Sequence, residues 1–200
     1  MPAELQIVLL AAGSASRFGS AKQSAPIGGV AMVRRAAMAA LSTGAELLVV
    51  TGAYTDAVAD ELAGLPLTLL HNAQWQGGMG GSIACGFRQI LSASAQAEAA
   101  IVCLADQPLV GAAQLQRLID DPRRAAERII AADHGKTLGP PCLFPRRYFV
   151  ELSELSGMQG ARSLLDRHAA EVTAVFMPEA AVDIDTPLDY ERLIAAHPAG

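Results

Sequence analysis

The chain has 200 residues, of which 52% are hydrophobic and 18% charged, and its formal net charge is −5. This composition excludes intrinsic disorder, which requires low hydrophobicity and high net charge. It also argues against binding to a nucleic-acid polymer, which requires a basic surface. The length suits one domain over residues 1–200 with a substantial core.

The amino-terminal segment and the cysteines bear on where the protein resides. Residues 1–6 lack the basic region of a signal peptide, and the apolar run 7–12 is too short to span a bilayer. The three cysteines are widely spaced and form no CxxC pair, so we interpret them as buried thiols in a reducing compartment. We therefore expect a cytoplasmic protein without membrane contact.

Short apolar runs alternate with segments of helical periodicity through the first two thirds of the chain. Strands are predicted over 6–10, 46–50, 67–70, 99–104 and 129–132, and helices over 32–41, 55–62, 82–92 and 114–119. Uninterrupted apolar strands separated by helices are typical of a mostly parallel sheet that is covered on both faces. The pattern predicts a three-layer α/β/α, Rossmann-like fold.

The last third is less regular. Gly139-Pro140-Pro141 is interpreted as a break before a short apolar run over 142–144. Helices are predicted over 148–155 and 161–168, a strand over 172–176 and an extended piece over 183–185. A final helix is predicted over 187–196, with Thr186 as its N-cap and proline at its first position.

The first chemical motif follows the first strand and reads LAAGSASRFGSAKQ over residues 10–23. Gly13 and Gly19 permit close approach of the backbone, so consecutive N–H groups could hold phosphate oxygens. Arg17 and Lys22 add two cations. A solvated Gly/Ser turn with two incidental cations is the alternative.

Two aspartate motifs follow other predicted strands, and ligands bind at this edge of such sheets. Asp106 comes directly after the strand 99–104, and Asp183 and Asp185 stand two apart on an extended piece. One or two carboxylates together with substrate phosphates are the usual setting for Mg²⁺. The alternative for each is a helix cap.

A glycine-rich segment, Gly77-Gly78-Met79-Gly80-Gly81, precedes Ser82 at the start of a predicted helix. We predict a flexible loop that opens onto a helix N-terminus, where backbone groups could meet a base edge or a phosphate. The alternative is a mobile surface loop.

Taken in order, these motifs resemble the nucleotidyltransferases of molybdenum cofactor maturation, and most closely the branch that uses CTP. The resemblance rests on LAAGxSxRFGxxKQ, NxxWxxGMxxS, DQP and DIDTP, together with GPPCLFPRRYF and GMQGAR over 139–162. It covers essentially the whole chain. Ala12 and the sequence GMGGS, where the GTP-using branch has glycine and a GPL-type loop, favour CTP over GTP.

The resemblance implies a nucleotidyltransferase fold and an Mg²⁺-dependent reaction. It implies catalytic roles for Arg17, Lys22 and Asp106, and Mg²⁺ binding by Asp106 and Asp185. The acceptor would be molybdopterin or the molybdenum cofactor, which would pass to a recipient molybdoenzyme or its chaperone. The residues implied to bind CTP are Leu10, Ala11, Ala12, Gly13, Arg17, Lys22, Asn72, Gly78, Met79, Ser82 and Asp106.

One departure bears on the acceptor, because Met158 stands where the GDxGAR pattern has an acidic residue. Three alternatives therefore stay open at this point. They are a GTP-using molybdenum cofactor guanylyltransferase, a nucleotidyltransferase acting on a sugar or polyol phosphate, and a non-catalytic carrier or chaperone of the cofactor.

Overall fold

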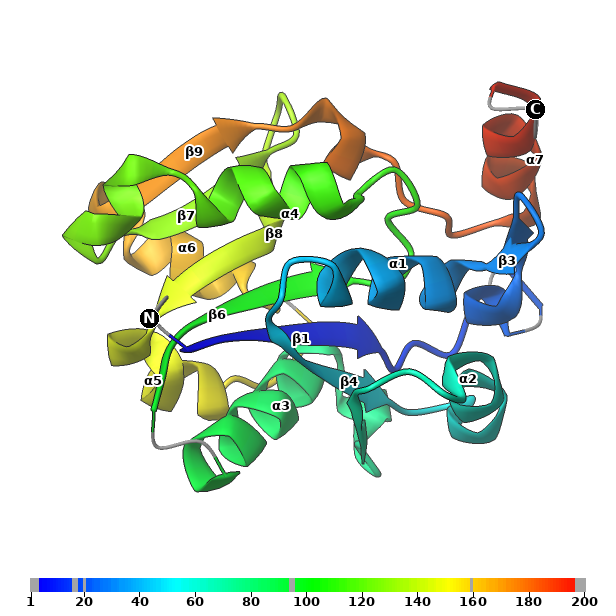
Figure 1. The fold of residues 1–200 in the computed structure, drawn as a ribbon, viewed down its shortest axis with the longest axis horizontal. Helices are drawn as coiled ribbons and strands as arrows, with labels where there is room; N and C mark the ends of the chain where they lie inside the picture. Colours follow the sequence, from blue (N-terminus) through cyan, green and yellow to red (C-terminus); the bar gives the residue numbers. More distant parts are fainter. Residues whose placement is uncertain (1–3, 16–17, 20, 94–95, 159, 197–200) are drawn as a thin grey trace.

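The computed structural model describes residues 4–15, 18–19, 21–93, 96–158 and 160–196, and its centre is a seven-stranded sheet in the order β5-β4-β1-β6-β8-β7-β9 (Figure 1). Strands β5, β4, β1 and β6 run parallel, as do β7 and β9, whereas β8 is antiparallel to both of its neighbours. The predicted mostly parallel α/β/α fold is confirmed. The strands are β1 (Glu4–Ala11), β4 (Glu46–Thr51), β5 (Thr68–His71), β6 (Ala97–Leu104), β7 (Ile129–Asp133), β8 (Leu138–Pro145) and β9 (Val172–Phe176).

Helices cover both faces of the sheet because successive residues of each strand point to opposite sides. Ile7 and Leu9 of β1 pack under α1 (Met32–Leu41), α2 (Thr55–Leu62) and α4 (Ala112–Ile119). Val8 and Leu10 pack against the other layer, which consists of α3 (Met79–Ala93), α5 (Phe149–Ser153) and α6 (Arg162–Arg167). All four of these side chains are buried.

The C-terminal helix α7 (Pro187–Ala196) lies at one end of the molecule (Figure 1). Ile184 and Leu193 pack there with Ile27 and Met32, beside the small hairpin of β2 (Pro26–Ile27) and β3 (Val30–Ala31). Short 3-10 turns occupy 22–24, 75–77, 122–126, 146–148, 169–171 and 178–181. None of the described helices is both long and apolar enough to cross a membrane.

One local prediction is wrong. Gly139-Pro140-Pro141 does not break the chain, because β8 runs through it. Its pairing with β7 shifts register between Ala131 and Ala132, and the proline residues, which have no N–H to donate, fall at this irregularity. Residues 183–185, the predicted extended piece, lie beside the end of β6 without joining the sheet.

The glycine-rich segment was also predicted wrongly, because α3 begins at Met79 rather than Ser82. Gly80 and Gly81 are therefore helical, and the N–H of Gly80 donates to the carbonyl of Gly157 at 2.9 Å. A Cβ at Gly80 would lie 2.6 Å from the Ser156 carbonyl oxygen, so the missing side chain lets the loop at 156–157 pack closely on the helix. Tertiary packing here outweighs the weak helix propensity of glycine.

The chain order places one crevice at the carboxyl end of β1. From β1 the chain passes through α1 to β4 on one side, and it later returns through α3 to β6 on the other side. Such a switch in strand order is where open α/β sheets bind ligands.

Candidate nucleotide site

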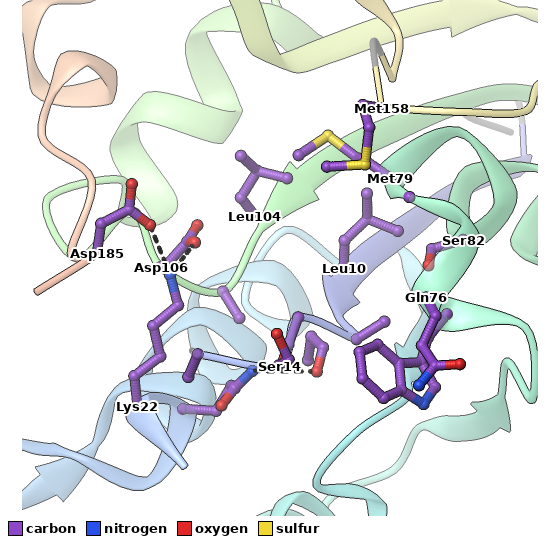
Figure 2. A pocket seen from close by; sticks show the side chains of 18 residues that line it. Leu10, Ser14, Lys22, Gln76, Met79, Ser82, Leu104, Asp106, Met158 and Asp185 are labelled. Atoms are coloured by element: carbon purple, nitrogen blue, oxygen red, sulfur yellow. Dashed lines mark hydrogen bonds and ion pairs between the residues drawn. The ribbon is translucent and has the colours of Figure 1, made fainter. Parts of the chain in front are cut away.

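A cavity of about 360 Å³ lies at this switch point, and Figure 2 shows its two ends. Lys22, Asp106 and Asp185 lie at one end, and Gln76, Met79 and Ser82 lie at the other, with Leu10 between them. The volume falls within the range of small-molecule sites. The lining residues are Leu10, Ala11, Ala12, Gly13, Ser14, Ala15, Lys22, Gln23, Trp75, Gln76, Gly78, Met79, Ser82, Leu104, Ala105, Asp106, Met158 and Asp185.

Residues 13–15, in the loop after β1, line the cavity. Among the described residues, the N–H groups of Gly13, Ser14 and Ala15 find no hydrogen-bond acceptor. Ala15 has a φ of 49°, a left-handed conformation that an alanine adopts only at an energetic cost and that is found at functional loops. Consecutive free N–H groups around such a residue can hold an anion.

The carbonyl oxygens of this loop accept hydrogen bonds from neighbouring segments. Gln23 is buried, and its Nε2 donates to the oxygens of Gly13 at 3.0 Å and Ala11 at 3.4 Å. The N–H of Ala53 donates to the oxygen of Ala12 at 3.3 Å. The carbonyl oxygens of residues 11–13 therefore have donors, whereas the N–H groups of residues 13–15 have no acceptor in the part of the chain that the structure describes.

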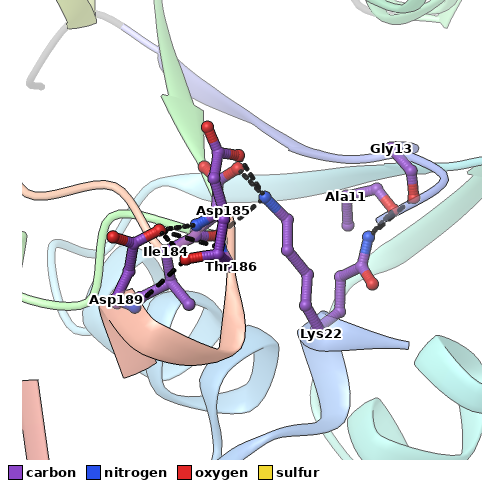
Figure 3. A network of polar contacts seen from close by, with 9 residues as sticks. Ala11, Gly13, Lys22, Ile184, Asp185, Thr186 and Asp189 are labelled. Carbon is purple, nitrogen blue, oxygen red and sulfur yellow. Dashed lines mark hydrogen bonds and ion pairs between the residues drawn. The ribbon is translucent and has the colours of Figure 1, made fainter. Parts of the chain in front are cut away.

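Lys22 joins the polar end of the cavity into one network (Figure 3). Its Nζ donates to Asp106 Oδ2 at 2.7 Å, to the carbonyl oxygen of Ile184 at 2.8 Å and to Asp185 Oδ1 at 3.1 Å. Burial alone would lower the pKa of Lys22, but the charges and hydrogen bonds of Asp106 and Asp185 outweigh it and the pKa is raised. The lysine therefore stays charged in this setting.

Backbone contacts bring the two aspartates together from distant parts of the sequence. The N–H of Ile184 donates to the carbonyl of Asp106 at 2.9 Å, which fixes the 184–185 segment beside the end of β6. Immediately afterwards, Asp189 Oδ2 accepts from the N–H of Thr186 at 2.8 Å, and Thr186 Oγ1 accepts from the N–H of Asp189 at 3.2 Å. This reciprocal cap anchors the start of α7 and so the position of Asp185.

Asp183, which is not one of the lining residues, adds a third carboxylate near Asp106 and Asp185. Partial burial, followed by the charge of Asp106, raises the pKa of Asp183 to about 6, although its side chain keeps access to solvent. Repulsion between like charges is the physical reason that Asp106 contributes to the shift. The polar end of the cavity is consequently acidic around a single described ammonium, that of Lys22.

The donor set at this end fits a divalent cation that is completed by substrate. Among the described residues, no cluster of three or more His, Cys, Asp or Glu side chains is arranged to hold a metal ion. Asp106 and Asp185 nevertheless converge on one point, because both contact the same Lys22 Nζ. Two carboxylates with phosphates and water are a normal Mg²⁺ environment.

The other end of the cavity is shaped by the start of α3. Asn72 does not line the cavity; it is buried, and its Nδ2 donates to Oγ of Ser82 at 3.0 Å. A Cβ at Gly52 would lie 2.5 Å from the oxygen of Ala12 and 2.7 Å from Cβ of Trp75, so this glycine lets the Trp75 turn approach the first loop. This end therefore offers a Trp side chain and a fixed hydroxyl to a ligand.

The cavity brings together nearly all residues that the sequence singled out, namely 10–13, Lys22, Gly78, Met79, Ser82, Asp106 and Asp185. Arg17 lies outside the described residues. Sequence reasoning assigned no role to Trp75, Gln76 or Gln23, although all three fall inside its motifs. Met158, the departure from the GDxGAR pattern, lines the cavity and is 79% exposed.

Comparison with known proteins agrees with this architecture. A family model described as MobA-like NTP transferase domain matches residues 7–172. Rv0371c from Mycobacterium tuberculosis H37Rv is 25% identical with a TM-score of 0.81, over 98% of this chain and 99% of that one. A structure of the same protein in complex with manganese has 25% identity and a TM-score of 0.79, over 96% and 99% of the two chains.

A nucleotidyl transfer enzyme is also among the similar structures. This nucleotidyl transferase from Methanothermobacter, Mth528, is 21% identical with a TM-score of 0.79, over 96% of each chain, a likeness that concerns the fold. Among curated proteins, no sequence matches this chain.

Proposed function

Because this chain belongs to the MobA-like NTP transferase family, we propose that it transfers CMP from CTP to the phosphate of molybdopterin or the molybdenum cofactor. The observation that carries the proposal is the meeting, in one cavity, of two groups: the N–H groups of residues 13–15, which have no acceptor among the described residues, and the network of Lys22, Asp106 and Asp185. The N–H groups can bind a polyphosphate, and the Lys22 network can neutralise charge on it.

The reaction requires little covalent chemistry from the protein. A phosphate oxygen of the acceptor attacks the α-phosphorus of CTP, an O–P bond forms, and the bond to the bridging oxygen breaks so that pyrophosphate leaves with the electron pair. The loop N–H groups orient the triphosphate, and Lys22, with Arg17 from the same loop, stabilises the developing charge. A phosphate acceptor is already anionic near neutral pH, so no strong general base is needed.

A bound Mg²⁺ would neutralise phosphate charge as a Lewis acid, held by Asp106 and Asp185. The manganese complex of Rv0371c supports a divalent cation in a protein of this kind. The three free cysteines, two of them fully buried, fit the reducing cytoplasm in which we place the protein.

CTP is the nucleotide favoured by the chain's own residues. Ala12 lines the cavity beside Gly13, where the GTP-using branch that the sequence resembles has glycine. Ser82, fixed by Asn72, and the start of α3 at Met79 are proposed to place the base.

Met158 favours a second candidate acceptor. A thioether carries no charge and is only a weak hydrogen-bond acceptor, so the acid that the molybdenum cofactor enzymes present at this position is missing. The second candidate reaction is therefore cytidylyl transfer to a sugar or polyol phosphate in the same site.

The deciding experiment measures pyrophosphate release from CTP or GTP with Mg²⁺ and each acceptor in turn. Release with CTP and molybdopterin is the expected result, and release with GTP alone would contradict the base assignment. Release only with a sugar or polyol phosphate would favour the second candidate. Cofactor binding without pyrophosphate release would indicate a carrier.

The matched variant is Asp106→Asn, which keeps the shape of the side chain and removes its charge. We expect its turnover to fall at least about a hundredfold, because metal-assisted charge neutralisation contributes several kcal/mol. Nucleotide binding is followed separately by the fluorescence of Trp75, the only tryptophan of the chain, which lines the cavity.

A further inference from the structure

Gln23 is buried next to Lys22 in the same short turn, yet it has no part in the reaction described above. Its side chain is 2% exposed, and its Nε2 donates to the carbonyl oxygens of Gly13 and Ala11. Both partners are acceptors, so the amide nitrogen and not the oxygen must face them. The Oε1 atom is buried and has no hydrogen-bond partner within the described residues.

These contacts engage the carbonyl oxygens of the loop and leave its N–H groups without a described partner. A loop without regular structure can direct either its carbonyl oxygens or its N–H groups inward. With the oxygens of residues 11 and 13 bound to Gln23, the N–H groups of Gly13, Ser14 and Ala15 have no described partner at the cavity wall. Pre-organised donors of this kind bind an anion without first having to reorganise.

We propose that Gln23 is a positioning residue that holds residues 11–15 in the conformation that binds the polyphosphate chain of the substrate. The proposal rests on the proposed function only in requiring a polyphosphate ligand. A single turn, Lys22–Ser24, then contacts both the aspartates and the loop over residues 11–15. Its first residue, Lys22, donates to Asp106 and Asp185, and its second, Gln23, donates to the carbonyl oxygens of residues 11 and 13. Figure 3 shows Lys22 extending toward Asp185, with Ala11 and Gly13 on its other side.

The test compares Gln23→Met with Gln6→Met, using inorganic triphosphate with Mg²⁺ as the probe and Trp75 fluorescence as the readout. Gln6 is a matched control, because it is also a buried glutamine with a side-chain hydrogen bond, to Glu46 at the opposite end of β1. Methionine preserves side-chain length and removes the donor. We expect triphosphate to bind Gln23→Met at least about fivefold more weakly, and Gln6→Met within about twofold of wild type.

Equal affinity in wild type and a folded Gln23→Met would overturn the proposal. If that variant does not fold, NMR of the wild-type protein decides. The side-chain amide protons of Gln23 should exchange slowly, and the amides of Gly13 and Ser14 should shift on addition of triphosphate. Fast exchange of the Gln23 side-chain amide protons, or unchanged Gly13 and Ser14 amide signals on addition of triphosphate, would overturn the proposal. If triphosphate binding depends on Gln23 but no nucleotide yields pyrophosphate, the proposed reaction is contradicted while the role of Gln23 is supported.

Discussion

Replacing Lys22 by methionine tests the electrostatics of the site most directly. The change removes three hydrogen bonds, to Asp106, Ile184 and Asp185, and leaves two carboxylates facing one another. Losing one partner of a fully buried pair costs about 3–5 kcal/mol. Here the side chains of Asp106 and Asp185 are 26% and 41% exposed, so water compensates in part. We expect a loss of about 2 kcal/mol, which lowers Tm by about 4–8 °C.

The pH range of this effect follows from the sign of the pKa shift. The pKa of Lys22 is raised, so its contribution is fully present below its ordinary value of about 10.4 and is lost as pH rises through the folded-state value. The difference in Tm between wild type and Lys22→Met should therefore be constant from about pH 6 to pH 9.

Divalent cations supply the second arm of the same experiment. In Lys22→Met the aspartates lack their ammonium, so millimolar Mn²⁺ should raise the Tm of the variant more than that of wild type. Lys136→Met is the control, because Lys136 is the only other lysine and is exposed on the β7–β8 turn. The reasoning is refuted if Lys22→Met has the same Tm as Lys136→Met and wild type, or if Mn²⁺ raises the Tm of all three proteins equally.

Three further outcomes are expected. Gly78→Ala should lower the free energy of unfolding, measured in urea, by about 1–3 kcal/mol. The reason is that Gly78 has a φ of 105° and that a Cβ there would lie 2.5 Å from the oxygen of Gly157. Gly77→Ala is the control and should be about as stable as wild type, because a Cβ at Gly77 meets open space. At pH 8 an aromatic disulfide reagent should modify at most one thiol, Cys85, and all three only after denaturation, because the other two are fully buried and their pKa values are raised. Asp189→Ala should lower Tm at neutral pH, because hydrogen bonds from the Thr186 hydroxyl and N–H hold the pKa of Asp189 below its ordinary value. This stabilisation is lost as pH falls through the folded-state pKa, so the Tm values of variant and wild type should converge in acid.

Periodicity predicted the strands well because parallel strands buried on both faces are apolar at nearly every position. The strand 172–176 and the helices 32–41, 55–62 and 187–196 agree with the structure at both ends. The same reasoning predicted the edge at which a ligand binds, since residues just after parallel strands collect at one side of a sheet. For this reason Asp106 could be selected without knowledge of its contacts.

What the sequence could not provide were features set by contacts between distant segments. The meeting of Asp106 with Asp185 depends on a backbone hydrogen bond between Ile184 and Asp106. The early start of α3 depends on the loop at 156–157, which packs against Gly80. Gln23 reads as an ordinary polar residue in LAAGSASRFGSAKQ, because only the fold of the loop shows which carbonyls its amide reaches.

The acidity of the site leads to a last prediction, that CTP binding depends on a divalent cation. Among the described residues, the carboxylates of Asp106, Asp183 and Asp185 outnumber the ammonium of Lys22, so these groups together repel a polyanion that arrives without metal. By Trp75 fluorescence, we expect wild-type affinity for CTP to be at least about tenfold weaker in EDTA than in Mg²⁺. Asp106→Asn should bind CTP in EDTA at least as well as wild type, since it carries one fewer negative charge, and should gain little from Mg²⁺. If wild type binds CTP equally with and without the cation, these carboxylates serve as permanent partners of Lys22 and not as metal ligands.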